Sequence, residues 1–221
     1  MGDSILNSWH ANAQQWIATI EGRELESRRL VTDQAIVDTI LKYQPETLLD
    51  VGCGEGWLCR ALSEQGIQTL GVDGVPALIE SARQKGKSKF EVATYQDLIQ
   101  EKPLPIAPFE SVVINFALLD QETTESLLLT LKHCLKKSGW LFIQTLHPHV
   151  LSDDQPYQSG WRSGSWDGLK QNFTQPYEWY FRTLEDWVQL FSQSGYQLTE
   201  LREPLHPQTG KPASVIFVLR A

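Results

Sequence analysis

Three closely spaced glycines are the first residues in this sequence whose spacing suggests a chemical role. They are Gly52, Gly54 and Gly56. They follow the apolar run LLDV, and glycines in such a turn let backbone N–H groups approach a ligand. A second apolar run ends at Asp73, twenty-one residues after Gly52, where a carboxylate can accept hydrogen bonds from both hydroxyls of a ribose. The pattern predicts a cofactor that contains a nucleoside.

The register of these glycines separates two kinds of nucleotide site. A dinucleotide-binding turn requires G-x-G-x-x-G, whose last glycine permits close contact between helix and strand. Counted from Gly52, the sixth position is Trp57, which is too bulky for that contact. No Gly-Lys-Ser or Gly-Lys-Thr follows, so a phosphate-binding P-loop is excluded. The sequence reads G-x-G-x-G instead, which leaves an NAD-dependent oxidoreductase as the weaker alternative.

Alternating strands and helices must hold these residues in place. Strand-like apolar runs occur at 47–51, 67–73, 89–93, 110–115 and 140–146. Helices are expected over about 56–65, from Pro76 onwards, and from a cap at Asp120 to Lys136. This alternation implies right-handed crossovers and a parallel sheet covered on both faces.

The N-terminal segment is expected to be helical. Apolar residues recur at helical spacing from Trp9 onwards, with Ser8 as the N-cap. A charged connector over 21–29 then leads to a second helix near 32–43, for which Thr32 is the expected cap.

The C-terminal part breaks the alternating pattern. Residues 147–181 show no clear period but contain many aromatic side chains, which argues against disorder and favours a functional loop. Thr183 with Asp186 then indicates the start of a helix over 184–194. Two strands are expected after it, at 196–201 and 214–220.

The successive motifs resemble those of class I S-adenosylmethionine-dependent methyltransferases. The motifs are LLDVGCGEG, GVDGVPALIESAR, FESVVINFALLD and LKKSGWLFIQT, within residues 47–146. The resemblance implies an α/β, Rossmann-like fold, with a seven-stranded, mostly parallel sheet, helices on both faces and the last strand antiparallel. One domain would then comprise an N-terminal helical cap (1–45), a cofactor-binding core (47–146), an aromatic substrate-lid insertion (147–182) and a C-terminal helix and hairpin (183–221).

By the same resemblance, S-adenosyl-L-methionine is the cofactor. Its methionine end is expected along the glycine turn and its ribose on Asp73. Thr94 and Tyr95 are expected near the adenine, and Asn115 and Phe116 near the sulfonium. The complete expected cofactor set is Asp50, Gly52, Cys53, Gly54, Gly56, Asp73, Gly74, Thr94, Tyr95, Asn115, Phe116 and Arg28.

Several residues of this set also have a structural interpretation, which for Asp73 is a simple solvated strand end. Asp50 can order the glycine turn by accepting hydrogen bonds from backbone N–H groups. Cys53 is interpreted as a small packing residue rather than a nucleophile. Tyr95 and Phe116 form either a wall of the cofactor site or ordinary core.

The implied reaction is an in-line displacement, in which a nucleophile of the acceptor takes the methyl group from a positively charged sulfur. A hydroxyl nucleophile needs a general base, for which His147 and His149 are the candidates. The alternative is a structural histidine fixed by Pro148. Arg28 or Arg29 pairs with the cofactor carboxylate or, alternatively, lies on a solvated face.

The composition limits the partners. Acidic residues outnumber basic ones 27 to 19, and the formal charge of −8 opposes a nucleic-acid partner. The segment after Asn115 also lacks the prolines of the N-P-P-Y-like segment carried by enzymes that methylate base amines. The aromatic insertion and the N-terminal helix predict lids over a pocket for a small organic acceptor.

Three cysteines without metal-ligand spacing predict no metal site and fit a cytoplasmic protein. No apolar run is long enough for a membrane span, and a monomer or homodimer is expected. Because these motifs indicate binding rather than transfer, a non-catalytic partner subunit that binds the cofactor remains an alternative.

Overall fold

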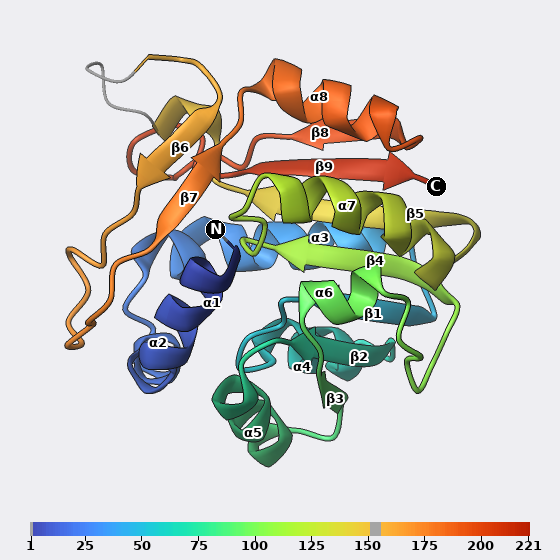
Figure 1. The fold of residues 1–221 in the computed structure, drawn as a ribbon, viewed down its shortest axis with the longest axis horizontal. Coiled ribbons are helices and arrows are strands. Elements are labelled where there is room, and N and C mark those ends of the chain that lie inside the picture. The colour runs from blue at the N-terminus through green and yellow to red at the C-terminus, as the bar shows by residue number, and fades with distance from the viewer. Residues whose placement is uncertain (1, 151–155) are drawn as a thin grey trace.

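A twisted seven-stranded sheet forms the centre of the computed structural model, which describes residues 2–150 and 156–221 (Figure 1). The strand order is β3-β2-β1-β4-β5-β9-β8. The strands are β1 (Thr47–Val51), β2 (Gln68–Asp73), β3 (Lys89–Val92), β4 (Phe109–Asn115), β5 (Leu135–Thr145), β8 (Gln197–Arg202) and β9 (Val215–Arg220). The first five pair in parallel and β9 runs antiparallel to β5, as predicted.

Helices cover both faces of the sheet (Figure 1). They are α1 (Gly2–Ala11), α2 (Ala13–Glu21), α3 (Asp33–Lys42), α4 (Trp57–Glu64), α5 (Pro76–Lys85), α6 (Tyr95–Ile99), α7 (Glu122–Leu131) and α8 (Leu184–Gln193). Strand order reverses between β1 and β4, because β2 and β3 lie on one side of β1 and β5 on the other. Ligands of open α/β sheets bind beyond the carboxyl ends of the strands at this point.

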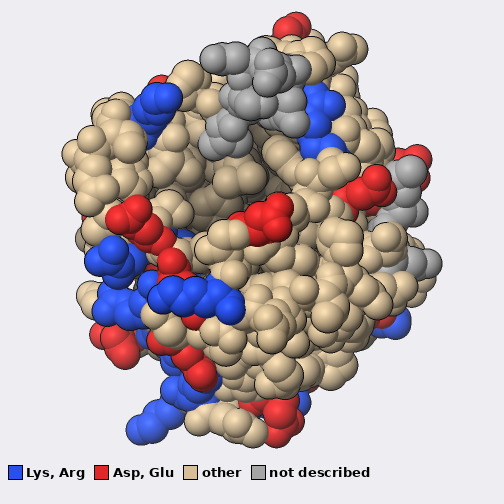
Figure 2. Space-filling view, turned by 90° about the vertical axis from the view of Figure 1, so that its left-hand side faces the viewer, with Lys and Arg blue, Asp and Glu red and all other residues tan. Residues whose placement is uncertain are grey.

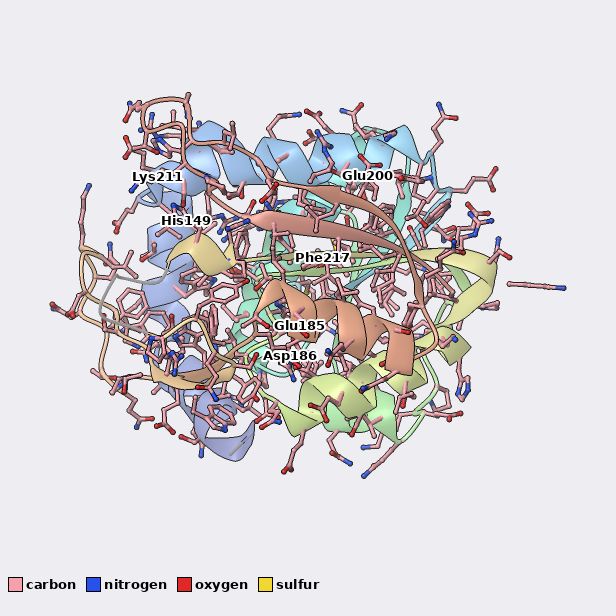
Figure 3. All side chains as sticks on the ribbon, turned by 90° about the horizontal axis from the view of Figure 1, so that it is seen from above. His149, Glu185, Asp186, Glu200, Lys211 and Phe217 are labelled. Carbon is pink, nitrogen blue, oxygen red and sulfur yellow. The ribbon has the colours of Figure 1, made fainter. Side chains whose placement is uncertain are left out.

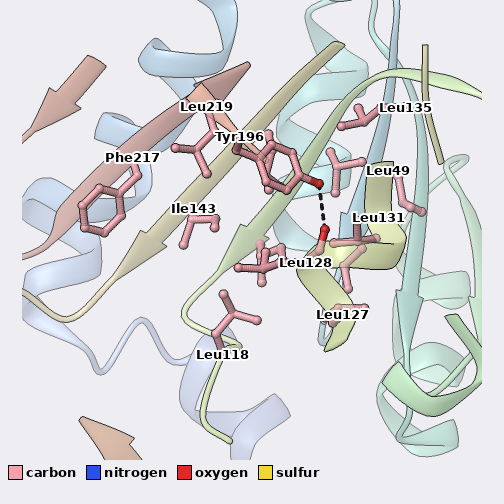
Figure 4. Packing of buried hydrophobic residues seen from close by; sticks show 14 of the residues in the cluster. Leu49, Leu118, Leu127, Leu128, Leu131, Leu135, Ile143, Tyr196, Phe217 and Leu219 are labelled. Atoms are coloured by element: carbon pink, nitrogen blue, oxygen red, sulfur yellow. Dashed lines mark hydrogen bonds between the residues drawn. The ribbon is translucent and has the colours of Figure 1, made fainter. Parts of the chain in front are cut away.

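Alternating residues of the central strands face two separate cores. Val112 and Ile114 of β4 face the core built with α6, α7 and α8, whereas Val113 faces the core built with α3 and α4. Tyr196 joins the first core and donates a hydrogen bond of 3.0 Å to the carbonyl of Leu128 (Figure 4). Because both faces are buried, the sheet forms a rigid base for its carboxyl edge.

The N-terminal helices begin earlier than predicted. Ser8 lies inside α1 and is not an N-cap, because the helix already starts at Gly2. The break between α1 and α2 falls at Asn12, which is fully buried. Its side-chain amide donates to the carbonyls of Ser8 and Gln175, and these bonds stabilise the interruption.

Thr32 does not cap α3 as predicted. A π-helical turn over Arg28–Thr32 leads directly into the helix, so the chain is already helical at this position. The Thr32 side chain accepts no capping hydrogen bond. The second half of the expected connector is therefore part of a continuous helical segment.

The helix expected from Asp120 to Lys136 is shorter than predicted. α7 ends at Leu131, a 3-10 turn follows, and β5 already starts at Leu135, which is buried beside Phe109 of β4. Asp120 is not the N-cap, because Gln121 holds that position without a side-chain capping bond, but Asp120 still accepts a hydrogen bond of 2.7 Å from the N–H of Thr123.

A short hairpin lies inside the segment that showed no period. β6 (Gly160–Ser163) and β7 (Glu178–Phe181) pair antiparallel, while residues 151–155 of the expected lid lie outside the described residues. Thr183 caps α8 by accepting from the N–H of Asp186, as predicted. The reciprocal bond of a capping box is not made, because the N–H of Thr183 donates to Ser159 instead.

Arg182 anchors this hairpin to the start of α7, which follows β4. Its guanidinium donates to the carbonyl of Gln121 at 3.1 Å and lies over the rings of Tyr180 and Trp187. Only 3% of the residue is exposed. The N–H of Tyr180 also donates to the carbonyl of Leu119 at 2.8 Å, so the hairpin is held beside the strand ends.

Replacing Arg182 by Met should lower the free energy of unfolding by about 3 kcal/mol, because buried carbonyls lose a charged donor. Urea unfolding followed by circular dichroism measures the change. Arg29→Met is the matched control, because Arg29 is exposed and its ion pair with Glu26 is long, at 3.8 Å. This substitution should change the free energy of unfolding by less than about 0.5 kcal/mol. Equal effects of the two substitutions would show that Arg182 is not an anchor.

Candidate functional site

The glycine turn lies at the carboxyl end of β1, where the strand order reverses. Gly52 has a φ of +75°, and a Cβ atom at this position would lie 2.5 Å from the Cβ of Ala117. The N–H groups of Gly52 and Cys53 both donate to the carbonyl of Val72, at 2.8 and 3.0 Å. The turn is thus fixed between the ends of β2 and β4, and only glycine fits its first position.

Asp73 holds the next part of the turn. Its Oδ2 accepts a hydrogen bond of 2.9 Å from the N–H of Gly54, and its Oδ1 accepts one of 2.9 Å from the N–H of Val75. Burial raises the pKa of Asp73, while the two N–H groups lower it. Each oxygen keeps a further lone pair, so the carboxylate can still accept hydrogen bonds from a ligand.

Asp50 does not order the turn through backbone N–H groups. In the structure that role belongs to Asp73, and Asp50 accepts a hydrogen bond only from the thiol of Cys59, at 3.5 Å, among the described residues. Asp50 is 1% exposed, and burial raises its pKa to about 7. It is a buried group behind the turn, with no open path to a ligand.

Cys53 packs in a small core between the turn and α5. It contacts a cluster that includes Cys59, Ile79 and Phe90, and burial raises the pKa of its thiol well above the usual value. A thiol with a raised pKa holds little thiolate at neutral pH, so this environment does not suit a nucleophile.

The residues after β3 are tied to the end of β4. Thr94 caps α6, since its hydroxyl accepts from the N–H of Asp97 and its own N–H donates to the Asp97 carboxylate. Tyr95 donates a hydrogen bond of 2.8 Å to the carbonyl of Ala117, and its hydroxyl lies 2.9 Å from where a Cβ of Gly52 would be. Tyr95 is therefore a wall beside the glycine turn.

The end of β4 is strained. Phe116 has a φ of +53°, which a residue with a Cβ atom rarely adopts, and its N–H donates to the carbonyl of Gln144 at 2.8 Å. Such strain is typical of functional sites. The Oδ1 atom of Asn115, the preceding residue, is buried and has no hydrogen-bond partner in the part of the chain that the structure describes.

The two candidate bases differ sharply in their surroundings. His147 is 7% exposed, its Nε2 lies 2.7 Å from Oε1 of Glu203, and its Nδ1 accepts a hydrogen bond of 3.0 Å from the N–H of His149. Both of its ring nitrogens are thus occupied. His149 is exposed beyond the end of β5, at the same end of the molecule as Lys211 (Figure 3). This geometry favours a structural role for His147.

Arg28 lies on the outer side of the glycine turn. Its Nε is 2.9 Å from Oδ1 of Asp33, and its guanidinium lies 4.8 Å above the ring of Trp57. With Glu55, Arg60 and other charged residues it lines a cleft of about 510 Å³ between α2 and the start of α4. The ion pair with Asp33 already occupies one side of the guanidinium, and Arg29 is exposed near Glu26.

The N-terminal helices lie directly over the turn. A Cβ on Gly74 would lie 3.1 Å from Leu6, and one on Gly54 would lie 3.9 Å from the indole nitrogen of Trp16. The face at the carboxyl ends of the strands is hollowed near its centre, with acidic and basic side chains gathered around it (Figure 2).

The hairpin segment and α1 are locked together. Asn12 donates to the carbonyl of Gln175 at 3.0 Å and accepts from the N–H of Thr174 at 2.7 Å. The rings of Trp9 and Trp166 meet edge to face, with centroids 5.3 Å apart. This role of Asn12 was not predicted from the sequence. The signal that could have indicated it is a polar residue interrupting the apolar stripe of the N-terminal helix.

Comparison with known proteins agrees with this geometry. A family model described as a methyltransferase domain matches residues 21–201. The chain belongs to this methyltransferase domain family. The match includes the sheet as far as β8, the helices around it and the hairpin insertion.

Individual relatives match to different extents. The chain is 33% identical over 105 residues to a ubiquinone biosynthesis O-methyltransferase of Xylella fastidiosa (strain M23), which is 45% of this chain and 42% of that protein. The matched part thus spans less than half of that relative. An uncharacterized methyltransferase of Geobacillus sp. (strain WCH70) is 25% identical over 203 residues, 90% of this chain and 92% of that one.

The fold recurs in solved structures. An S-adenosylmethionine dependent methyltransferase from Mesorhizobium loti superposes with a TM-score of 0.62 at 21% identity, covering 83% of this chain and 96% of that one. At this identity the likeness concerns the fold. No helix among residues 2–150 and 156–221 is both long enough and apolar enough to cross a membrane.

The buried carboxyl of Asp50 should make stability depend on pH. A raised pKa means that the folded state binds the proton more tightly than the unfolded chain, so stability falls as pH rises from about 4 to about 7. Asp50→Asn removes this titration. The free energy of unfolding of the variant minus that of the parent should therefore rise across that window, by up to roughly 4 kcal/mol.

Urea unfolding at pH 4.5, 5.5, 6.5 and 8 measures this difference. Asp97→Asn is the matched control, because hydrogen bonds from Lys102 and Thr94 lower the pKa of Asp97 to about 2. Its difference from the parent should be nearly constant over the same range. An equally constant difference for Asp50→Asn would contradict the raised pKa.

Proposed function

We propose that this protein transfers the methyl group of S-adenosyl-L-methionine to a small organic acceptor. The observation that carries the proposal is the Asp73 carboxylate, which is fixed by two backbone N–H groups beside the glycine turn. It lies at the end of β2, where a ribose diol is bound in nucleotide sites of this fold. The family membership supports the same reaction.

The residues present fit this cofactor. Gly54 has a φ of +56° and only the Trp16 indole near its Cβ position, which leaves that part of the turn open on one side. Asp73 offers free lone pairs for hydroxyl groups, and residues 50–57 and 115–120 contain no Lys or Arg that would repel a sulfonium. We assign the ribose to Asp73 and the sulfonium to the region of Asn115 and Phe116.

When bound, S-adenosyl-L-methionine supplies a methyl group that is activated by the positive charge of its sulfur. With the cofactor held by Asp73 and the glycine turn, the acceptor nucleophile would bond to the methyl carbon as the sulfur–methyl bond breaks, and the cofactor would be released as a neutral thioether. If the nucleophile carries a proton, a base or solvent takes it. The chain mainly aligns the reactants, while α1 and the hairpin segment exclude water.

A hydroxyl acceptor is favoured by one group of relatives. The printed name of ubiquinone biosynthesis O-methyltransferase specifies methylation on oxygen, whereas that of demethylmenaquinone methyltransferase names a quinone and no acceptor atom. The matched segments cover less than half of those proteins. We propose an aromatic or other hydroxylated small molecule, and a cytoplasmic monomer or homodimer whose cysteines stay reduced, since all three are free.

Calorimetry should show that S-adenosylmethionine and S-adenosylhomocysteine bind and that NAD does not. Asp73→Asn should weaken S-adenosylhomocysteine at least tenfold, because the ribose loses a charged acceptor. Asp73→Glu keeps the charge and should retain more affinity, and unfolding curves show whether both variants fold. Tight binding of NAD, or unchanged affinity in Asp73→Asn, would contradict the proposal.

His149→Ala should slow single-turnover methylation of a phenol by about 10²-fold or more and leave S-adenosylhomocysteine affinity unchanged, if His149 takes the proton. His147→Gln should instead lower stability, because it loses the contact with Glu203. Equal turnover in His149→Ala and the parent would exclude His149 as the base. A phenol that no variant methylates would favour a non-catalytic, cofactor-binding subunit.

A further inference from the structure

Three buried oxygen atoms without hydrogen-bond partners lie at one end of the sheet. They are Thr32 Oγ1, Asn115 Oδ1 and Gln144 Oε1, and no partner exists for them among the described residues. Buried polar atoms in native proteins are almost always paired, because each unpaired one costs about 1–3 kcal/mol. An unpaired cluster therefore indicates a ligand or a bound water.

The three residues are neighbours in the fold. Asn115 and Gln144 are registered opposite each other in the parallel pair of β4 and β5. They share the face of Val113 and Phe142, which packs against α3. Thr32 immediately precedes α3, and its carbonyl accepts a hydrogen bond of 3.2 Å from Nε2 of Gln144. We call Thr32, Asn115 and Gln144 the polar corner.

The orientation of Gln144 is fixed by its bonds. Its Nε2 donates both to the carbonyl of Thr32 and, at 2.8 Å, to the hydroxyl of Ser214. A flipped amide would turn its oxygen toward the Thr32 carbonyl, which offers no proton. The unpaired atom is therefore an acceptor, and Gln144 is 1% exposed.

The polar corner adjoins the region that we assign to the sulfonium. Asn115 is only partly buried, unlike Thr32 and Gln144, and it belongs both to the corner and to that region. Phe116, with its strained backbone, bonds to the carbonyl of Gln144. A ligand group seated there would lie beside the methyl group of the proposed cofactor.

We propose that the polar corner binds an O–H or N–H group of the methyl acceptor, which donates hydrogen bonds to the oxygens of the corner. This inference rests on the proposed function and adds the chemistry of the acceptor to it. The two amide oxygens require protons from their ligand, and the hydroxyl can either accept or donate. The corner contains no carboxylate, so an uncharged donor suits it better than an ammonium ion. Acceptors with such a donor next to the methylated atom should be preferred over compounds that lack it.

Thr32→Val tests the proposal with the whole protein saturated with S-adenosylhomocysteine. Valine has nearly the same shape and removes only the unpaired hydroxyl, so the melting temperature should stay or rise. Binding of catechol, measured by ligand-observed NMR titration, should weaken about five- to tenfold, the usual effect of one lost hydrogen bond. Asn115→Leu should weaken it similarly.

Thr19→Val is the matched control. Thr19 Oγ1 is also buried and unpartnered among the described residues, but it lies on α2, away from β4 and β5. Its replacement should affect the melting temperature like Thr32→Val and leave catechol affinity unchanged. A loss of affinity in both variants would assign the effect to general packing and overturn the proposal.

Matched probes distinguish the two donors. Catechol is compared with 1,2-dimethoxybenzene, and aniline with N,N-dimethylaniline, and all four are uncharged at neutral pH. The donor-bearing member of at least one pair should bind at least fivefold more tightly. Equal binding within both pairs, no binding of any probe, or unchanged affinity in Thr32→Val would show that the corner holds only water. Failure of S-adenosylhomocysteine itself to bind would instead contradict the proposed function.

Discussion

The hydrogen bonds from Gly54 and Val75 to the carboxylate of Asp73 are the constraint on which the site depends. They join the turn after β1 to the end of β2, so that two segments far apart in the chain form one binding edge. An acidic side chain is required here, because both neighbours present N–H groups. The same carboxylate keeps lone pairs for a ligand, so one residue both shapes the turn and serves as the expected ribose contact.

The roof over this edge depends on a second buried polar residue. Asn12 interrupts the N-terminal helix and bonds to the hairpin segment on both sides of its amide. A buried amide is costly unless all its groups are paired, so these bonds fix how α1 meets the insertion. Arg182 does the same at the other end of the hairpin. The roof is therefore attached at both ends by polar contacts, while aromatic packing fills the space between them.

Local sequence signals predicted the elements whose causes are local. β1 matches its predicted bounds, and α5 begins at Pro76 as predicted. Their signals, an apolar run and a proline at the first helical position, act within a few residues. Ser8 and Thr32 failed as caps, because each cap signal lies within a longer helical segment that tertiary contacts stabilise. The end of α7 was misplaced because strand pairing at Leu135 competes with helix propensity.

The same distinction explains which site residues the sequence could indicate. Asp73 and the glycines lie next to strand ends, so their spacing was sufficient to predict that they lie together. Asp50 was predicted to order the glycine turn, but Asp73 does so in the structure. Both carboxylates follow apolar runs, and only the fold shows which of them faces the N–H groups. The polar corner combines Thr32 with Gln144, residues 112 positions apart. Only a polar glutamine inside an otherwise apolar strand hinted at it.

Three departures from a well-satisfied structure lie at the carboxyl edge of the sheet. Phe116 has a strained backbone, Asp50 is a buried carboxyl with a raised pKa, and the polar corner leaves oxygens unpaired. A rigid sheet with two apolar cores can tolerate such costs at one edge. Selection for stability alone would remove them, because valine at position 32 or asparagine at position 50 would eliminate the unfavourable group at little cost to the rest of the structure. Their position where the strand order reverses fits an edge that is shaped by what it binds.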